Sequence, residues 1–283
     1  MAAVAADARV KPAGGQVAGA VVAQPGTNHA PAAPELPGLC CWLDLEPRDG
    51  AWHMAWDQTL LEAVAGPWLR VYRWPREEVT FGYFMRWAEV EPRLQGRPAT
   101  RRWTGGGLVE HGADWTFSLM IPRACLSADW SPRTCYRWLH RHLLEALRKM
   151  GAAAGGLTLA DRDTVASPGG ACFERPVAAD LMAGGRKVAG GAQRRGRLGL
   201  LHQGSLQWPA LTSAWVAHFA GSLAREVEWV GGSDGAPVTP AAAAPAGMMP
   251  SPLATATIPA AWHTRARELT AERYACHSWT RAR

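Results

Sequence analysis

The sequence lacks any run of eighteen or more apolar residues, because Arg, Asp, Gly or Pro interrupts every hydrophobic stretch. We therefore expect a soluble protein. Cysteine is scarce, with 6 in 283 residues and no CxxC pair, which argues against a disulfide-dense scaffold and against the usual zinc and thioredoxin-type sites. The Ala/Val-rich start has no leucine-rich core typical of an export signal. These features together predict a reduced, cytoplasmic protein.

Charge is also modest, with Lys+Arg 30 against Asp+Glu 24 and a net charge of +6. Such a small excess of positive charge leaves nucleic acid, an anionic membrane surface and an acidic protein partner open. The hydrophobic share of 48% is enough for a sizeable core.

Composition divides the chain into four parts. Residues 1–37 contain much Ala, Val, Gly and Pro and no aromatic residue, which predicts a disordered tail. Residues 231–257 have a similar composition and are interpreted as a Pro/Ala-rich linker. Between them, 38–230 is predicted to form the main folded domain, and 258–283 a C-terminal helical segment that packs on it.

Hydrophobic patterns within 38–230 predict both helices and strands. Ser131 and Pro132 form a helix start, after which apolar residues recur every four positions until Gly151. Further helices are expected over 52–65 and 212–224. Strands are expected over 69–74, 79–84, 115–121, 187–193 and 198–208. The order predicts an α+β fold with a mixed, mainly antiparallel sheet flanked by helices.

Two segments concentrate residues suited to chemistry. The first is RRWTGGGLVEH (101–111), in which consecutive glycines allow a ligand to approach the backbone beside permanent cations. An ordinary Gly-rich hairpin turn is the alternative. The second segment, 168–206, alternates Gly-rich turns with a cysteine, an aspartate, a Gly-Arg-Lys step and a His-Gln-Gly-Ser strand.

These segments resemble the catalytic domain of the biotin/lipoate protein ligase family, in its lipoate-protein ligase and cysteine-dependent octanoyltransferase branch. The matching motifs are RRWTGGGLVEH, ACFERP (171–176), GRKVAGGAQRR (185–195), LLHQGSL (200–206), WDQTLLEA (56–63) and ERYACHSW (272–279). The resemblance implies a class II synthetase-like fold and a role in protein lipoylation. It further implies an acyltransferase that moves an octanoyl or lipoyl group from acyl carrier protein, without a cofactor, to a lysine of lipoyl domains of 2-oxoacid dehydrogenases or the glycine cleavage protein.

The same resemblance implies the roles of individual residues. Cys172 stands where the nucleophile of the octanoyltransferases is expected, and Lys187 would lower its pKa and stabilise the oxyanion. The substrate-binding candidates are Arg101, Gly105, Gly106, Gly107, His111, Asp180, Gly190, Gly191 and His202. Either histidine would serve as a proton shuttle or be structural, and no metal site is expected. Ala179-Asp180 departs from the Tyr-acid step common in the family, which leaves the shape of the pocket open.

The sequence leaves two other functions and the role of one basic segment open. An ATP-dependent lipoate-protein ligase would use ATP and Mg²⁺ to form lipoyl-adenylate, with Arg101 and the glycines around the phosphates. A non-catalytic protein that binds acyl domains or nucleic acid is the most distant alternative. The basic run from Arg186 to Arg197 would either steer acidic acyl carrier and lipoyl domains or form a solvated strand edge.

Overall fold

The computed structural model describes residues 35–151, 156–161, 176–208, 210–231 and 257–282. Cys172 and the predicted linker 231–257, apart from its first and last residues, lie outside these ranges. The helices are α1 (Gly50–Ala63), α2 (Trp87–Val90), η1 (Glu91–Arg93), η2 (Arg123–Cys125), α3 (Pro132–Lys149), α4 (Trp215–Leu223), α5 (Ala260–Leu269), η5 (Thr270–Tyr274) and α6 (His277–Thr280). The strands are β1 (Leu36–Asp44), β2 (Trp68–Arg73), β3 (Glu78–Phe81), β4 (Ala99–Arg101), β5 (Leu108–His111), β6 (Trp115–Pro122), β7 (Thr158–Leu159), β8 (Leu181–Ala183), β9 (Arg186–Arg195), β10 (Gly199–Leu206) and β11 (Ala224–Trp229).

Eight of these strands form the main sheet, in the order β11-β1-β2-β6-β10-β9-β8-β7. β1 runs parallel to both of its neighbours, and the other pairs are antiparallel. A small second sheet has the order β4-β3-β5. The mixed, mainly antiparallel sheet expected from the sequence is confirmed.

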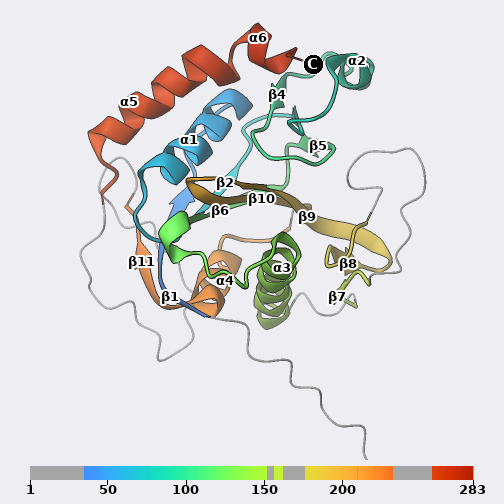
Figure 1. Ribbon diagram of the computed structural model, residues 1–283. Coiled ribbons are helices and arrows are strands. Elements are labelled where there is room, and N and C mark those ends of the chain that lie inside the picture. Colours follow the sequence, from blue (N-terminus) through green and yellow to red (C-terminus); the bar gives the residue numbers. More distant parts are fainter. Residues whose placement is uncertain (1–34, 152–155, 162–175, 209, 232–256, 283) are drawn as a thin grey trace, which may run out of the picture. The chain divides into compact units, whose positions relative to one another are not determined.

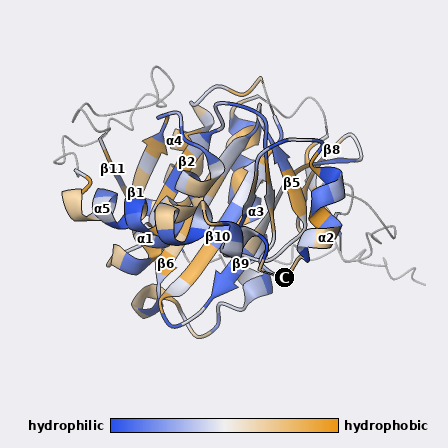
Figure 2. Cartoon of the chain, turned by 90° about the horizontal axis from the view of Figure 1, so that it is seen from above, coloured by the Kyte–Doolittle hydropathy of each residue, from blue (hydrophilic) through white to orange (hydrophobic). Residues whose placement is uncertain are grey.

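Helices cover both faces of the main sheet. α1 and α5 lie on one face, beside the small sheet, and α3 and α4 lie on the other (Figure 1). Hydrophobic colouring follows β6 in the middle of the sheet, whereas the end of β9 is hydrophilic (Figure 2). The sheet separates a core on one face from a core on the other. Because successive side chains of a strand point to opposite faces, neighbouring residues enter different cores.

Local chemistry explains where the two longest helices begin. The Asp49 side chain accepts a hydrogen bond from the Trp52 amide at the start of α1, and the Ser131 hydroxyl accepts one from the Thr134 amide at the start of α3. Such caps satisfy amides that have no partner within the helix. α3 then buries Cys135, Leu139, Leu143 and Leu147 and is followed by Gly151 at a φ of 73°. The predicted four-residue spacing and the Gly stop are confirmed.

The predicted boundary between the tail and the folded domain, after residue 37, differs from the structure. β1 begins at Leu36, inside the segment interpreted as a tail, and pairs with both β2 and β11. Leu36 and Leu39 are buried by this pairing. The strand was missed because its Pro-Gly start resembles a turn.

The C-terminal segment packs on the domain through α1. Leu269 and Tyr274 join a buried cluster with Met54 and Ala55 of α1. The Arg101 guanidinium donates to the carbonyl oxygens of Trp279 and Thr280, at 3.0 to 3.2 Å. The last helices are thus tied to the small sheet by a buried arginine.

Candidate active site

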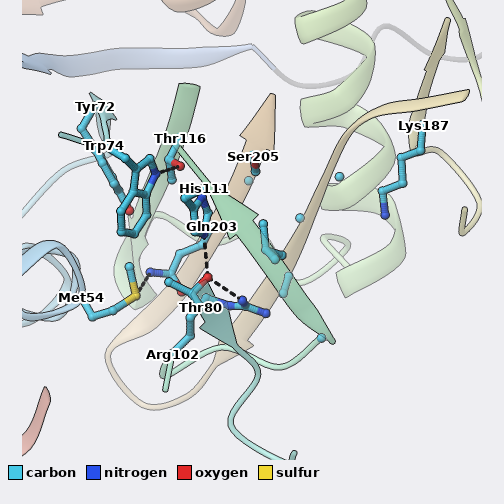
Figure 3. A pocket seen from close by; sticks show the side chains of 16 residues that line it. Met54, Tyr72, Trp74, Thr80, Arg102, His111, Thr116, Lys187, Gln203 and Ser205 are labelled. Carbon is cyan, nitrogen blue, oxygen red and sulfur yellow. Dashed lines mark hydrogen bonds between the residues drawn. The ribbon is translucent and has the colours of Figure 1, made fainter. Parts of the chain in front are cut away.

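A cavity lies between the main sheet, α1 and the small sheet. It follows one row of residues across four strands, which are in register: Gly190 of β9, Ser205 of β10, Thr116 of β6 and Tyr72 of β2. Lys187 lies at one side of the cavity and Tyr72 and Trp74 at the other (Figure 3). The cavity is therefore elongated and crosses the strands.

The Lys187 side of the cavity is organised by a buried carboxylate. The Lys187 Nζ lies 2.8 Å from Oδ2 of Asp180, and both side chains are almost fully buried. Asp180 also accepts a hydrogen bond from the Tyr136 hydroxyl of α3 at 2.5 Å and one from the Val177 amide at 2.7 Å. The hydroxyl of Tyr136 in turn accepts from the Gly191 amide at 2.8 Å. The position of Lys187 is thus fixed from the opposite face of the sheet.

Two glycines make room for this arrangement. A Cβ atom at Gly190 would overlap the end of the Lys187 side chain, so only glycine lets the lysine fold over the strand. A Cβ at Gly82 would overlap the carbonyl oxygen of Gly106, where the 102–107 loop crosses the end of β3. This loop joins β4 to β5 on opposite sides of β3 and is not the hairpin turn considered above.

A hydrogen-bonded chain forms a second wall of the cavity. Arg102 donates to the Thr80 hydroxyl at 2.8 Å, and that hydroxyl lies 2.7 Å from Nε2 of His111. Nδ1 of His111 lies 2.9 Å from Asp114, which also accepts from the Ser205 hydroxyl. Since the Asp114 carboxylate can only accept, Nδ1 of His111 carries a proton and donates to it.

Asp114 anchors this wall as an anion. Burial alone would raise its pKa, but the adjacent His111 and hydrogen bonds from His111, Ser205 and Gly112 hold the pKa below its ordinary value. Trp74 stacks on His111 with ring centroids 3.9 Å apart and donates from its indole to Thr116. The wall is consequently rigid.

Gln203 of β10 lines the cavity on the side next to α1. Its amide nitrogen donates to Asp57 at 2.7 Å and contacts the Met54 sulfur at 3.2 Å, while its oxygen accepts from Thr104 at 2.7 Å. The polar groups of Gln203, Thr80, Thr116 and Ser205 therefore bond to their neighbours in the wall. A cavity with polar groups so satisfied suits an apolar ligand, because no buried donor or acceptor is left to be desolvated.

A more open hollow adjoins the cavity and shares Gly106, Gly191 and Ala192 with it. Its other lining residues include Gly105, Arg133, Tyr136 and Val177. The hollow and the cavity therefore meet at β9 and at the 102–107 loop.

Most of the predicted site residues lie at the cavity or at the adjoining hollow. Lys187, Gly106, His111, Gly190 and Gly191 line the cavity, and Asp180 contacts it through Lys187. Gly105 lines the adjoining hollow, and the Gly107 carbonyl accepts from Arg102. Cys172 lies outside the described residues.

Arg101 is not directed at the cavity. Its guanidinium is fully buried and donates to the carbonyl oxygens of Tyr83, Met85, Trp279 and Thr280. Its neighbour Arg102 lines the cavity instead. Adjacent residues leave β4 in opposite directions, so the RRW motif alone did not indicate which arginine faces the ligand.

His202 lies on the face of the sheet opposite the cavity. It stacks on Phe117, and its ring lies 5.5 Å from that of His140 in α3. Burial, reinforced by His140, holds the pKa of His202 well below its ordinary value. Burial also lowers the pKa of His140 to about 4, against the opposing effects of Asp180 and the Ala179 carbonyl. Both rings are neutral packing groups, which corrects the placement of His202 beside the substrate.

The basic run of β9 does not form one patch. Arg194 stacks on Trp103 with 4.3 Å between guanidinium carbon and ring centroid, whereas Arg195 donates to the Cys135 thiol of α3 on the other face. Arg186 and Arg197 are exposed. Alternation along the strand distributes these charges, so only part of the run is available to a partner.

Sequence reasoning missed several lining residues. Met54, Tyr72, Trp74, Thr80 and Thr116 line the cavity but lie outside the glycine-rich motifs. Tyr136 was missed as well, because its position on α3 carries no sequence signal for a contact with Asp180. Within the described ranges, no group of three or more His, Cys, Asp and Glu side chains is placed to hold a metal ion, and no helix there is long and apolar enough to cross a membrane.

Comparison with known proteins agrees with this fold. The chain is 36% identical over 176 residues to Octanoyltransferase LipM of Symbiobacterium thermophilum, and 32% identical over 176 residues to that of Oceanobacillus iheyensis. Each alignment covers 58% of this chain and 63% of the relative, so the chain spans less than two thirds of the length of these relatives.

Solved structures share the fold at lower identity. A lipoate-protein ligase A bound with ATP superposes with a TM-score of 0.62 at 19% identity, covering 87% of this chain and 99% of that one. A bi-partite lipoate protein ligase from Thermoplasma acidophilum superposes with a TM-score of 0.54 at 20% identity, covering 87% and 96%. Residues 49–228, which include every lining residue of the cavity, match the lipoyl protein ligase A/B catalytic domain, and the chain belongs to this family.

Proposed function

We propose that the protein is an acyltransferase of protein lipoylation, which moves an octanoyl group from acyl carrier protein to a lysine of a lipoyl domain. The observation that carries the proposal is the elongated cavity with internally satisfied walls and the buried ammonium group of Lys187 at one side. A linear acyl chain fits such a cavity, with about 0.8 kcal/mol gained per buried methylene. The carbonyl would then lie beside Lys187.

The relatives support the acyl group and the class of acceptor. Those aligned above are named octanoyltransferases. The bi-partite ligase of Thermoplasma acidophilum was solved in a study of that enzyme and its E2 lipoyl domain. We propose a lipoyl domain as the acceptor here, with its lysine entering through the hollow beside Arg133 and Val177.

The reaction proceeds in two transfers. The Cys172 thiolate attacks the thioester carbonyl, the bond to the carrier sulfur breaks, and the carrier leaves as a thiol after taking up a proton. The neutral lysine amine of the lipoyl domain then attacks the Cys172 thioester, and the amine proton passes to the departing cysteine sulfur as the amide forms. An amide is more stable than a thioester, so the proposal requires no ATP or other cofactor.

Lys187 stabilises both tetrahedral intermediates in this scheme. Its ammonium group donates to the oxyanion, and Asp180 holds it in place. An ammonium already positioned before the reaction needs little reorganisation when the negative charge develops. Lys187 is therefore assigned as an electrostatic catalyst rather than a nucleophile.

The ATP-dependent ligase remains the second candidate, on the fold shared with a ligase bound with ATP. One observation argues against its predicted phosphate site, because the Arg101 guanidinium is occupied by four backbone carbonyls. Arg102 would have to take that role.

The test is incubation of the full chain with octanoyl-acyl carrier protein in the absence of ATP, followed by intact-mass measurement and then by addition of a lipoyl domain. We expect the enzyme to gain one octanoyl group and to pass it to the domain. Cys172→Ser should abolish the mass gain, whereas Cys125→Ser, at an exposed thiol, should leave it unchanged. Modification that requires free lipoate, ATP and Mg²⁺ and survives Cys172→Ser would replace the transferase with the ligase.

A further inference from the structure

We propose that Met54 of α1 is the stop that limits the length of the acyl chain, so that the enzyme is selective for chains of about eight carbons. The inference rests on the proposed function for the identity of the ligand, but its geometry comes from the cavity alone. Met54 is 3% exposed and lines the cavity together with Tyr72 and Trp74 on the side away from Lys187 (Figure 3).

The sheet provides a scale for the length of the cavity. Gly190, Ser205, Thr116 and Tyr72 are paired across four adjacent strands, and strands lie about 4.8 Å apart, so the row spans roughly 14 Å. An extended eight-carbon acyl chain spans about 9 Å at ordinary single-bond lengths, and a twelve-carbon chain about 14 Å. Eight carbons end before the Tyr72 side chain, whereas twelve need the space that the far-end side chains occupy.

The aromatic residues at the far end are held in place by their neighbours. Trp74 donates to Thr116 at 2.8 Å and stacks on His111. Tyr72 stacks on His53 with centroids 4.0 Å apart and lies under the Arg70 guanidinium. Moving either ring would break several contacts, so these rings form fixed walls.

Met54 differs from them in both flexibility and bonding. Methionine is unbranched and adapts its shape to its neighbours. Among the residues that the structure describes, its one polar contact is the 3.2 Å approach of the Gln203 amide to its sulfur, and Gln203 keeps Asp57 and Thr104 as partners without it. Shortening Met54 therefore extends the cavity toward the buried cluster of Leu269 and Tyr274 and leaves the hydrogen-bonded walls intact.

The experiment compares the full-length wild type with Met54→Ala, Met54→Phe and Met120→Ala, using hexanoyl, octanoyl, decanoyl and dodecanoyl carrier donors. Met120 is a matched control, because it is a fully buried methionine of β6 that belongs to a different cluster and does not line the cavity. The readout is the ratio of kcat/KM for each longer donor to that for octanoyl. A ratio within one variant is independent of how much of that variant is folded.

We expect Met54→Ala to raise the dodecanoyl to octanoyl ratio about tenfold, the gain for burying two more methylenes, while Met120→Ala leaves it unchanged. A larger side chain, Met54→Phe, should lower the octanoyl to hexanoyl ratio. Equal ratios in the wild type and Met54→Ala, or the same shift in both alanine variants, would overturn the inference.

Calorimetric titration with the free carboxylic acids of six to twelve carbons separates this inference from the proposed function. If no donor supports transfer but Met54→Ala binds dodecanoate, relative to octanoate, more tightly than the wild type does, the transferase proposal fails and the length stop stands. If transfer occurs and the preference for chain length does not move in either assay, the length stop fails alone.

Discussion

The ammonium group of Lys187 and the carboxylate of Asp180 form a buried ion pair of 2.8 Å, and the hydroxyl of Tyr136 binds the other carboxylate oxygen from α3. This relationship joins α3, β9 and the residue before β8 at the Lys187 side of the cavity. It makes the position of Lys187 depend on a helix that is distant in sequence. Four predictions follow from this pair and from the buried groups around it.

Removing the carboxylate should damage stability as well as activity. Asp180→Asn leaves the Lys187 ammonium buried without its counter-charge, and we expect the free energy of unfolding to fall by about 3 kcal/mol. Urea denaturation of the full chain measures this change. Asp129→Asn, at an exposed aspartate, is the control, and an equal loss in both variants would argue against a special role for the pair.

Adding one methyl group should displace Lys187 and reduce acyl transfer. The Cβ of Gly190→Ala would overlap the flexible end of Lys187, which can swing away from Asp180. We expect about a hundredfold loss of acyl transfer, typical of small misplacements of catalytic groups. Gly196→Ala, where a Cβ meets nothing within 4 Å, should retain activity. Normal transfer by Gly190→Ala would show that the position of Lys187 is unimportant.

Acid should weaken the fold through the buried histidines. The pKa of His140 is lowered to about 4 by burial, against about 6.5 in an unfolded chain. The unfolded state therefore binds more protons, and this contribution to stability is present above about pH 6.5 and is lost as the pH falls toward 4.

We expect this single histidine to account for about 3 kcal/mol of the loss between those two pH values. Denaturation of His140→Gln at several pH values should show a smaller decrease below pH 6.5 than the wild type. His277→Gln, at an exposed histidine, should retain the wild-type slope. A wild-type slope in His140→Gln would contradict the assignment.

Arg101 should act in the fold and not in substrate binding. We expect Arg101→Leu to lower the free energy of unfolding by about 3 kcal/mol, since buried carbonyls lose a charged donor, and to speed amide hydrogen exchange in 270–282. Arg86→Leu, at an exposed arginine that pairs with Glu89, should change neither. A stable Arg101→Leu variant that loses only octanoyl-carrier affinity would restore the arginine to the substrate site.

Local patterns predicted those features that depend on neighbours in sequence. The Ser131-Pro132 start and Gly151 end of α3 follow from capping and from φ preferences. The Gly-Arg-Lys step correctly marked Lys187 and Gly190 as neighbours of one cavity, because they lie on the same strand.

Other features depended on which face a residue takes. Arg101 and Arg102 are equivalent in the motif, yet one binds the C-terminal segment and the other lines the cavity. His202 and Gln203 are also adjacent, and they lie on opposite faces of β10. A one-residue difference reverses the side of a strand, and a motif contains no information about which side holds the ligand.

The sequence by itself determined the α+β class, the family and the strand that carries Lys187, because periodicity, caps and motifs act over short distances along the chain. Only the tertiary structure brought Tyr136 to Asp180, Met54 to the far end of the cavity and Arg101 to Trp279 and Thr280. These contacts join residues far apart in the chain. They are selected by the packing of helices on a sheet, in which burial and hydrogen-bond satisfaction are decided for all neighbours together.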